Sequence, residues 1–162
     1  VKTQAKNFVD GIIESGLCFI VIYPNNDCGS KDILDEYERL YSISRFKIFP
    51  SLRFEYFLTL LNNSDFMIGN SSSGLREAPY YLVPTIDIGT RQNNRVKLRS
   101  VHHCGYKKSD ILKEINEVVD GDADFSNEDV WFGDGDSDKR FKKILDNGEV
   151  WNIKHQKQFQ EL

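Results

Sequence analysis

The sequence has few of the features that mark membrane or secreted proteins. Its longest apolar runs, such as Leu17 to Tyr23, are far too short to cross a bilayer, and its amino terminus lacks the basic, apolar and small-residue pattern of a signal peptide. Its three cysteines are an odd and scattered set, without the spacing of a disulfide framework or a zinc site. We therefore expect a soluble protein of the reducing cytoplasm that has no membrane partner.

The sequence also lacks a large basic cluster. It has 25 acidic residues against 21 Lys and Arg, which gives a formal net charge of -4. Nucleic acids and anionic membranes are recognised through dense positive charge, so the charge pattern excludes both as expected partners.

The length and composition are those of one folded domain. The chain has 162 residues, of which 40% are hydrophobic, enough to bury a proper core. There is no internal repeat and no evident linker, so we expect a single domain over residues 1–162. The sequence begins with a helix-like segment. Because this is an unusual start for an α/β domain, we expect the chain to be part of a longer protein.

Short apolar runs alternate with segments of helical periodicity. Strands are expected at 17–23, 46–49, 66–68 and 85–88, and helices at 1–15, 30–41, 54–62, 75–81, 110–120 and 139–146. The first run is apolar throughout and predicts a strand buried on both faces, and Ser30 is the expected cap of the second helix. This alternation predicts a Rossmann-like, doubly wound parallel sheet with helices on both faces. In that fold, ligands bind at the carboxyl ends of the strands.

A loop of small polar residues, Gly69 to Glu77, connects an expected strand to an expected helix. Hydroxyls and backbone N–H groups there surround the positive end of a helix dipole, which suits an anion. The candidate binding residues are Ser71, Ser72, Ser73 and Gly74. An ordinary turn with a serine cap explains the spacing equally well, but three successive serines flanked by glycines favour binding. Ser72 is not a hydrolase nucleophile of the Gly-x-Ser-x-Gly type, because Asn70 stands two residues before it.

Glu77 is expected in the first turn of the helix that follows this loop. Its carboxylate can accept hydrogen bonds from a pair of sugar hydroxyls, or it can simply complement the helix dipole.

Two further loops follow expected strands and open onto the same edge. Gly89 to Arg95 carries Arg91 and Arg95, whose forked guanidinium groups suit a diphosphate, although exposed arginines are often only solvated. Residues 24–30 include Asn25, which can bind a ligand or stabilise its own turn. We expect a shared diphosphate site at this edge.

The spacing and identity of the residues argue against both candidate metal sites. His102 and His103 are adjacent, so on a strand they point to opposite faces. The three aspartates at alternate positions in 134–138 resemble the start of a calcium loop, but Lys139 and Leu145 replace its glycine and closing glutamate. We expect no metal.

Four separated motifs together resemble the hydrolysing UDP-N-acetylglucosamine 2-epimerases of the sialic-acid pathway type. They are Gly69 to Glu77, Ile88 to Gln92 with Arg95, Tyr23 to Asp27 with Gly29 and Ser30, and Phe132 to Gly135. The stretch from Trp151 to Phe159 is similar to the family's terminal segment. The resemblance covers most of the chain and matches the carboxy-terminal domain of these enzymes.

The resemblance implies the second domain of a two-domain fold of the glycosyltransferase-B type. Ser71 and Ser72 would then contact the diphosphate of UDP or UDP-N-acetylglucosamine, Glu77 the uridine ribose, and Arg91 a position near the phosphates and sugar. The family eliminates UDP to give 2-acetamidoglucal and adds water to release N-acetylmannosamine, with no metal or redox cofactor. Asp87, where Asn is common, and residues 93–94 before Arg95 depart from the pattern and leave the exact nucleotide sugar open.

The resemblance also places the catalytic acid and base carboxylates in an amino-terminal domain, and none of them is in this sequence. We therefore expect no catalytic residue in this chain and no turnover by the chain alone. Residues 148–162 would pack toward the amino-terminal domain, and the full-length enzyme is expected to be a homo-oligomer. The alternatives are the nucleotide-binding domain of a glycosyltransferase of the same architecture and a binding or regulatory module that senses a nucleotide sugar.

Overall fold

The computed structural model describes residues 1–121, 124–126, 132–133 and 135–152. The chain forms two compact units, Val1–Asp129 and Val130–Leu162. The prediction of one domain over residues 1–162 stays a prediction. The aspartate at position 134 and residues 153–162, which hold most of the expected terminal segment, lie outside the described residues.

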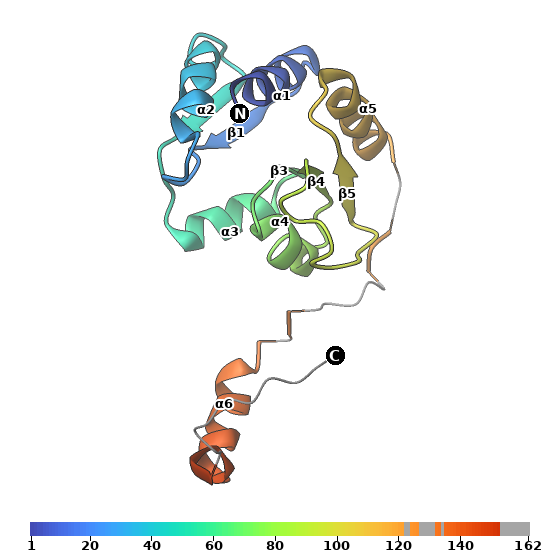
Figure 1. Cartoon of the computed structure of the whole chain (residues 1–162). Helices are drawn as coiled ribbons and strands as arrows, with labels where there is room; N and C mark the ends of the chain where they lie inside the picture. Colours follow the sequence, from blue (N-terminus) through green and yellow to red (C-terminus); the bar gives the residue numbers. More distant parts are fainter. Residues whose placement is uncertain (122–123, 127–131, 134, 153–162) are drawn as a thin grey trace, which may run out of the picture. The chain divides into compact units, whose positions relative to one another are not determined.

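The first unit is built from alternating helices and short parallel strands (Figure 1). Its strands are β1 (Phe19–Ile22), β2 (Phe46–Phe49), β3 (Met67–Gly69), β4 (Thr85–Ile88) and β5 (Val101–Cys104). Its α-helices are α1 (Lys2–Glu14), α2 (Ser30–Tyr37), α3 (Phe54–Asn62), α4 (Ser73–Arg76) and α5 (Lys108–Val119), and short 3-10 turns cover Glu38–Leu40 and Pro79–Tyr81. In the second unit, α6 (Ser137–Asp146) is followed by a 3-10 turn over Glu149–Asn152.

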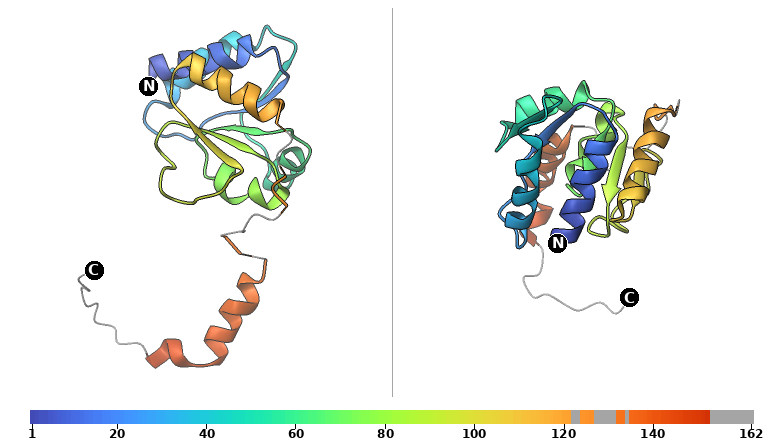
Figure 2. Two further views of the ribbon diagram at one scale, coloured as in Figure 1. Left: turned by 90° about the vertical axis from the view of Figure 1, so that its right-hand side faces the viewer. Right: turned by 90° about the horizontal axis from the view of Figure 1, so that it is seen from above.

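The helices of the first unit form two layers with the strands between them (Figures 1 and 2). Helices α1, α2 and α5 cover one face, and α3 and α4 cover the other. The larger core, on the α1 side, includes Ile12, Val21, Ile86 and Ile111. A smaller core on the opposite face joins α3 to the segment after α4 through Leu61, Ala78 and Val83. The predicted α/β fold with parallel strands and helices on both faces is confirmed.

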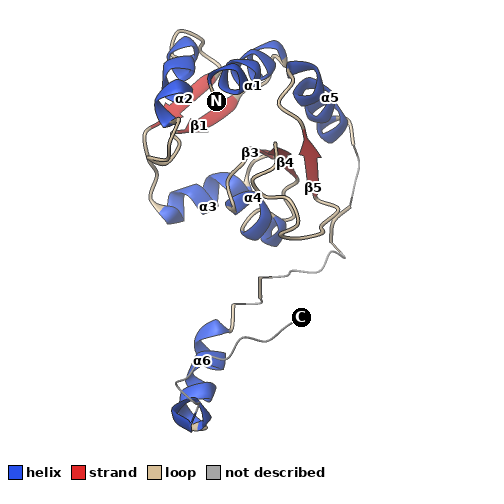
Figure 3. Ribbon diagram, viewed as in Figure 1, coloured by secondary structure: helices blue, strands red, loops and turns tan. Residues whose placement is uncertain are grey.

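The strands are divided between two hydrogen-bonded sheets. β1 pairs with β2, and β3, β4 and β5 pair in that order, all in parallel (Figure 3). The two sheets meet through the rings of Phe19 and Phe66, which pack edge to face with centroids 6.0 Å apart. Side chains from both sheets belong to the larger core.

The sequence predictions for the first strand and for the start of the second helix need correction. The run at 17–23 was expected to be buried on both faces, but within β1 only Val21 is buried and Ile20 is 49% exposed. A strand paired on one edge only leaves more of its side chains uncovered. Ser30 does not cap α2. It is the first helical residue, and the cap is Gly29, whose φ of 90° is a conformation that glycine adopts without strain.

Two later elements also differ from expectation. The helix expected at 75–81 is instead a single turn, α4, followed by the 3-10 turn Pro79–Tyr81. Proline at position 79 has no N–H to continue the helical hydrogen bonds. β5 follows β4 without an intervening helix and was not among the expected strands. The described residues contain no helix that is both long and apolar enough to span a bilayer.

Candidate functional site

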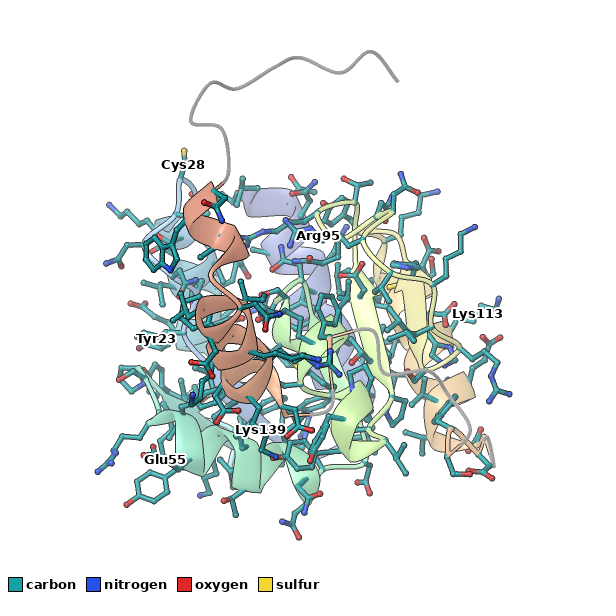
Figure 4. All side chains as sticks on the ribbon, turned by 90° about the horizontal axis from the view of Figure 1, so that it is seen from below. Tyr23, Cys28, Glu55, Arg95, Lys113 and Lys139 are labelled. Carbon is teal, nitrogen blue, oxygen red and sulfur yellow. The ribbon has the colours of Figure 1, made fainter. Side chains whose placement is uncertain are left out.

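The polar loops that follow β1, β3 and β4 lie at the carboxyl ends of parallel strands, as the fold requires. Figure 4 shows the side chains of Cys28 and Arg95, which come from the loops after β1 and β4. Two interactions between residues distant in sequence connect these loops, and they define the candidate site.

The serine loop, residues 70–74, is held by its own hydroxyls. Ser71 Oγ lies 2.6 Å from Ser73 Oγ and accepts a bond from the Ser73 N–H at 3.3 Å. The carbonyl of Ser71 accepts from the Gly74 N–H at 3.2 Å, which starts the turn of α4. Ser71 is exposed, and Ser72 and Ser73 are half-buried, so the loop presents hydroxyls at the surface.

Gly74 lets the serine loop pack directly onto β4. Thr85 Oγ1 donates a buried hydrogen bond of 2.8 Å to the Gly74 carbonyl. A Cβ atom at position 74 would lie 2.5 Å from Thr85 Cγ2, which is too close for any side chain. The glycine therefore sets the distance between the loop and the sheet.

Glu77 does not lie in the first turn of a longer helix, as the sequence predicted. It is half-buried at the end of the one-turn helix α4, and its N–H donates to the Ser73 carbonyl at 3.0 Å. A single turn carries a smaller dipole than the expected helix. The helix dipole therefore gives little support to a ligand role for this carboxylate, which stays a prediction.

Gln92 joins the loop after β4 to the serine loop. Its side chain is buried, with 1% of its surface exposed, and its Nε2 donates to the Asn70 carbonyl at 2.8 Å. Its Oε1 is buried and has no hydrogen-bond partner among the described residues. The sequence places Gln92 in the motif Ile88 to Gln92 but does not mark it as a site residue, because the burial of a loop glutamine depends on residues distant in sequence.

Arg91 joins the loop after β4 to the loop after β1. Its Nη2 lies 3.4 Å from Asp27 Oδ2, and both side chains are more than half exposed. Such a pair contributes little to stability. Asn25 and Arg95 are exposed on the same two loops, and Arg95 contacts the Gln92 carbonyl through its backbone N–H.

A buried carboxylate lies beneath this edge. Asp87 is 1% exposed, and its Oδ2 lies 2.8 Å from Nδ1 of His103, its register partner on β5. Burial raises the pKa of Asp87 above its ordinary value, and the contact with His103 acts in the opposite direction. A hollow of about 260 Å³ adjoins the imidazole, and its walls include Thr90 and Tyr106.

The two adjacent histidines do point to opposite faces of the sheet, as predicted. His103 faces Asp87, whereas His102 Nδ1 lies 3.6 Å from Glu114 on α5. Among the residues that the structure describes, no group of three or more His, Cys, Asp or Glu is arranged to hold a metal ion.

Parallel strands, helices on both faces and polar loops at the carboxyl edge define a Rossmann-like α/β protein. The family model for UDP-N-acetylglucosamine 2-epimerase matches residues 2–146. The chain therefore belongs to the UDP-N-acetylglucosamine 2-epimerase family.

Two curated relatives support this assignment. A UDP-N-acetylglucosamine 2-epimerase of Neisseria meningitidis is 46% identical over 151 residues, which cover 91% of this chain and 39% of the relative. A hydrolysing UDP-N,N'-diacetylbacillosamine 2-epimerase of Legionella pneumophila is 28% identical over 146 residues, or 90% of this chain and 38% of the relative. The chain thus spans well under half the length of these relatives.

Solved structures share the fold. The UDP-N-acetylglucosamine 2-epimerase of Methanocaldococcus jannaschii, in complex with UDP-GlcNAc and UDP, matches with a TM-score of 0.74 and 25% identity, over 91% of this chain and 42% of that one. The Neisseria meningitidis enzyme bound to UDP-GlcNAc gives a TM-score of 0.68 at 17% identity, over 88% and 41%. These similarities show that the chain has the α/β fold of the glycosyltransferase-B-like epimerases.

Proposed function

We propose that the chain is the carboxy-terminal, nucleotide-binding half of a hydrolysing UDP-N-acetylglucosamine 2-epimerase. The observation that carries the proposal is the connection of three polar edge loops through Gln92 and Arg91, in a chain that belongs to this family. The Legionella relative is named as a hydrolysing 2-epimerase, and the M. jannaschii structure holds UDP-GlcNAc and UDP. The parent would be a cytoplasmic enzyme of sialic-acid or related nonulosonic-acid synthesis, acting without a metal or redox cofactor.

The serine loop would hold the diphosphate. Hydroxyls of Ser71 and Ser72 and nearby backbone N–H groups donate to phosphate oxygens, and Ser73 and Gly74 shape the turn that presents them. Arg91 would add a charged donor. Because its exposed contact with Asp27 is weak, the guanidinium can leave that carboxylate for a phosphate at little cost.

Glu77 would accept hydrogen bonds from the ribose hydroxyls. It is half-buried and directly follows the helical turn that begins in the serine loop. Asn25 and Arg95, on the two flanking loops, would line the cleft around the sugar and phosphates.

The proposed reaction breaks the C1–O bond to UDP and removes the proton from C2, which gives 2-acetamidoglucal and UDP. Addition of water across the double bond then gives N-acetylmannosamine. The acid and base carboxylates would belong to the amino-terminal domain. This chain would contribute fixed positive charge and N–H donors, which stabilise the diphosphate as it leaves.

Titration of the 162-residue chain with UDP tests the nucleotide site. We expect Arg91→Ala and Ser72→Ala each to weaken binding roughly tenfold, which corresponds to about 1.4 kcal/mol. Arg53→Ala is the matched control, since Arg53 is an exposed arginine paired with Glu55 on α3, and it should leave the affinity unchanged. Unchanged affinity in both site variants would refute the assignment, and GDP in place of UDP measures the base preference.

The parent enzyme tests the reaction. Incubated with UDP-N-acetylglucosamine and no acceptor, it should release UDP and N-acetylmannosamine in equal amounts. Release of UDP only when an acceptor is added would instead establish a glycosyltransferase. Light scattering on the same preparation tests the expected homo-oligomer.

A further inference from the structure

The proposed nucleotide site makes no use of the pair formed by Asp87 and His103. The two residues are register partners on β4 and β5, and Asp87 Oδ2 lies 2.8 Å from His103 Nδ1. The Asp87 side chain is 1% exposed, whereas that of His103 is 41% exposed. A buried carboxylate therefore lies behind an imidazole that reaches the surface.

The carboxylate determines which ring nitrogen of His103 carries a proton. Asp87 is removed from water, and its Oδ1 has no hydrogen-bond partner among the described residues. Because an ionised carboxylate can only accept hydrogen bonds, it requires the Nδ1–H group of His103 as a donor. A neutral ring then keeps its lone pair on Nε2, and the carboxylate makes Nε2 a stronger acceptor.

The Nε2 atom is available to a ligand. The two nitrogens of an imidazole point away from each other, so Nε2 is directed away from the buried Asp87 carboxylate. None of the described residues forms a hydrogen bond with it. His103 lines the hollow of about 260 Å³ at the carboxyl ends of β4 and β5, which places an acceptor at this hollow.

The walls of the hollow are fixed by a contact that only glycine allows. Gly89 has a φ of 86°, and a Cβ atom there would lie 2.1 Å from the Tyr106 hydroxyl oxygen. Tyr106 is held from the other side, since Asn7 Nδ2 of α1 donates to its carbonyl at 3.0 Å and its side chain packs against the larger core. The loop after β4 and the Tyr106 ring are therefore set at a constant distance.

The chemistry of the walls suits a sugar. Thr90 and Asn93 are exposed and supply a hydroxyl and an amide, and Tyr106 supplies an aromatic ring. Among the described residues that line the hollow, none is Lys, Arg, Asp or Glu. Ligand pockets combine apolar surface with a few polar groups that fix orientation. A sugar ring presents C–H groups to the aromatic surface and hydroxyls to the neutral polar groups.

The hollow shares a loop with the proposed nucleotide site. Thr90 and Asn93 flank Arg91 and Gln92, and Gln92 bonds this loop to the Asn70 carbonyl. β3, β4 and β5 are neighbours in one sheet. Because adjacent strands lie about 4.8 Å apart, the hollow is within roughly 10 Å of the serine loop at the end of β3. A sugar attached to a diphosphate on the serine loop can reach it.

We propose that His103 is a sugar-binding and specificity-determining residue, whose Nε2 accepts a hydrogen bond from a hydroxyl of the nucleotide sugar. The sugar lies in the hollow with its apolar face toward Tyr106. Asp87 is a positioning residue, because it acts only through the imidazole. The proposal rests on the proposed function for the nucleotide, and it adds which residues of this chain select the sugar.

Titrations of the 162-residue chain with UDP and with UDP-N-acetylglucosamine separate the sugar from the nucleotide. We expect His103→Ala to weaken binding of the nucleotide sugar about fivefold, the effect of one hydrogen bond, and to leave the UDP affinity unchanged. His102→Ala is the matched control, since this adjacent histidine faces Glu114 on α5, and it should change neither affinity. Equal changes for both ligands in His103→Ala, or no change for either, would overturn the sugar contact.

Free N-acetylmannosamine tests the hollow without the nucleotide. Its addition should shift the imidazole signals of His103 in nuclear magnetic resonance spectra and leave those of His102 in place. Shifts in a chain that does not bind UDP would remove the proposed function and keep the hollow as a sugar site. Absence of shifts in a chain that binds UDP would remove the sugar site alone.

The positioning role of Asp87 has its own spectroscopic readout. Nitrogen chemical shifts of the His103 ring distinguish a protonated nitrogen from one that carries a lone pair. At mildly alkaline pH we expect a proton on Nδ1 in the wild-type chain and a mixture of both tautomers in Asp87→Ala. A proton on Nε2 in the wild-type chain would contradict the proposal, because Nε2 could then accept no hydrogen bond from the sugar.

Discussion

Single side chains set both the shape and the charge of the carboxyl edge. Gly74 allows the serine loop to contact Thr85, and Gln92 fixes the Asn70 carbonyl. Asp87 places a carboxylate in the protein interior directly below. Each of these features depends on one residue type, so each can be tested by one substitution.

Gly74→Ala should destabilise the chain by about 1–3 kcal/mol, the usual cost of overpacking a tight contact. The clash is with Thr85 Cγ2, so Thr85→Ser, which removes that methyl group and keeps the hydroxyl, should recover part of the loss in the double variant. Urea unfolding of the two single variants and the double variant measures the coupling. Strictly additive effects would contradict the contact.

Asp87→Asn should stabilise the chain more at pH 7 than at pH 4. Burial raises the folded-state pKa of Asp87, so its contribution to stability is fully present below the ordinary pKa of 3.8 and is lost as the pH rises through the raised value. Asparagine does not titrate and can still accept a hydrogen bond from His103. Unfolding free energies of both proteins at the two pH values check this.

Asp138→Asn, at an exposed aspartate of α6, is the control for that experiment. It should change stability little and similarly at both pH values. A gain from Asp87→Asn that does not depend on pH would contradict the burial argument.

The edge loops act together because they are bonded to each other. Gln92 connects the loop after β4 to the serine loop, and Arg91 connects it to the loop after β1. The helix that follows the serine loop has only four residues, so it cannot position the serines alone. The relative positions of the candidate site residues therefore depend on the bonds between the loops.

Gln92→Glu should cost about 2–3 kcal/mol of stability, because it replaces a donor by a buried acceptor that faces the Asn70 carbonyl. Gln92→Met, which removes the bond and keeps the bulk, should cost about 1 kcal/mol. UDP affinity should fall with both, since the serine loop is released. Gln4→Glu, at an exposed residue of α1, is the control and should change neither the stability nor the UDP affinity. If the Gln92→Glu variant is as stable as the wild-type chain, the connection between the two loops is wrong.

The chain as a whole covers 39% of its Neisseria relative. Its candidate residues are hydroxyls, amides, arginines and one carboxylate at the loops, a set that suits binding of a nucleotide diphosphate. The acid and base chemistry is expected from the remainder of a longer protein.

The 162-residue chain should accordingly bind UDP and produce no N-acetylmannosamine from UDP-N-acetylglucosamine. Product analysis after prolonged incubation, with the parent enzyme as the positive control, checks this. Turnover by the 162-residue chain would place a catalytic group within it, and Asp87 and His103 would be the first residues to substitute.

Much of the fold could be predicted because the signals are local. The alternating polar and apolar residues at 85–88 and the helical periodicity of 54–62 match β4 and α3 residue for residue. The serine loop was located correctly at the end of β3. β5 was not predicted, because its Val-His-His-Cys sequence combines polar and apolar residues without a clear alternation.

The sequence determined the alternation of strands and helices, the place of the polar loops and the family, since periodicity and motifs reside in neighbouring residues. Only the tertiary structure decided that Gln92 is bonded to Asn70, that Asp87 is buried against His103 and that the strands fall into two sheets. These features join residues 16 or more positions apart or depend on which strand edges meet. They follow from strand register and packing, which no local pattern encodes.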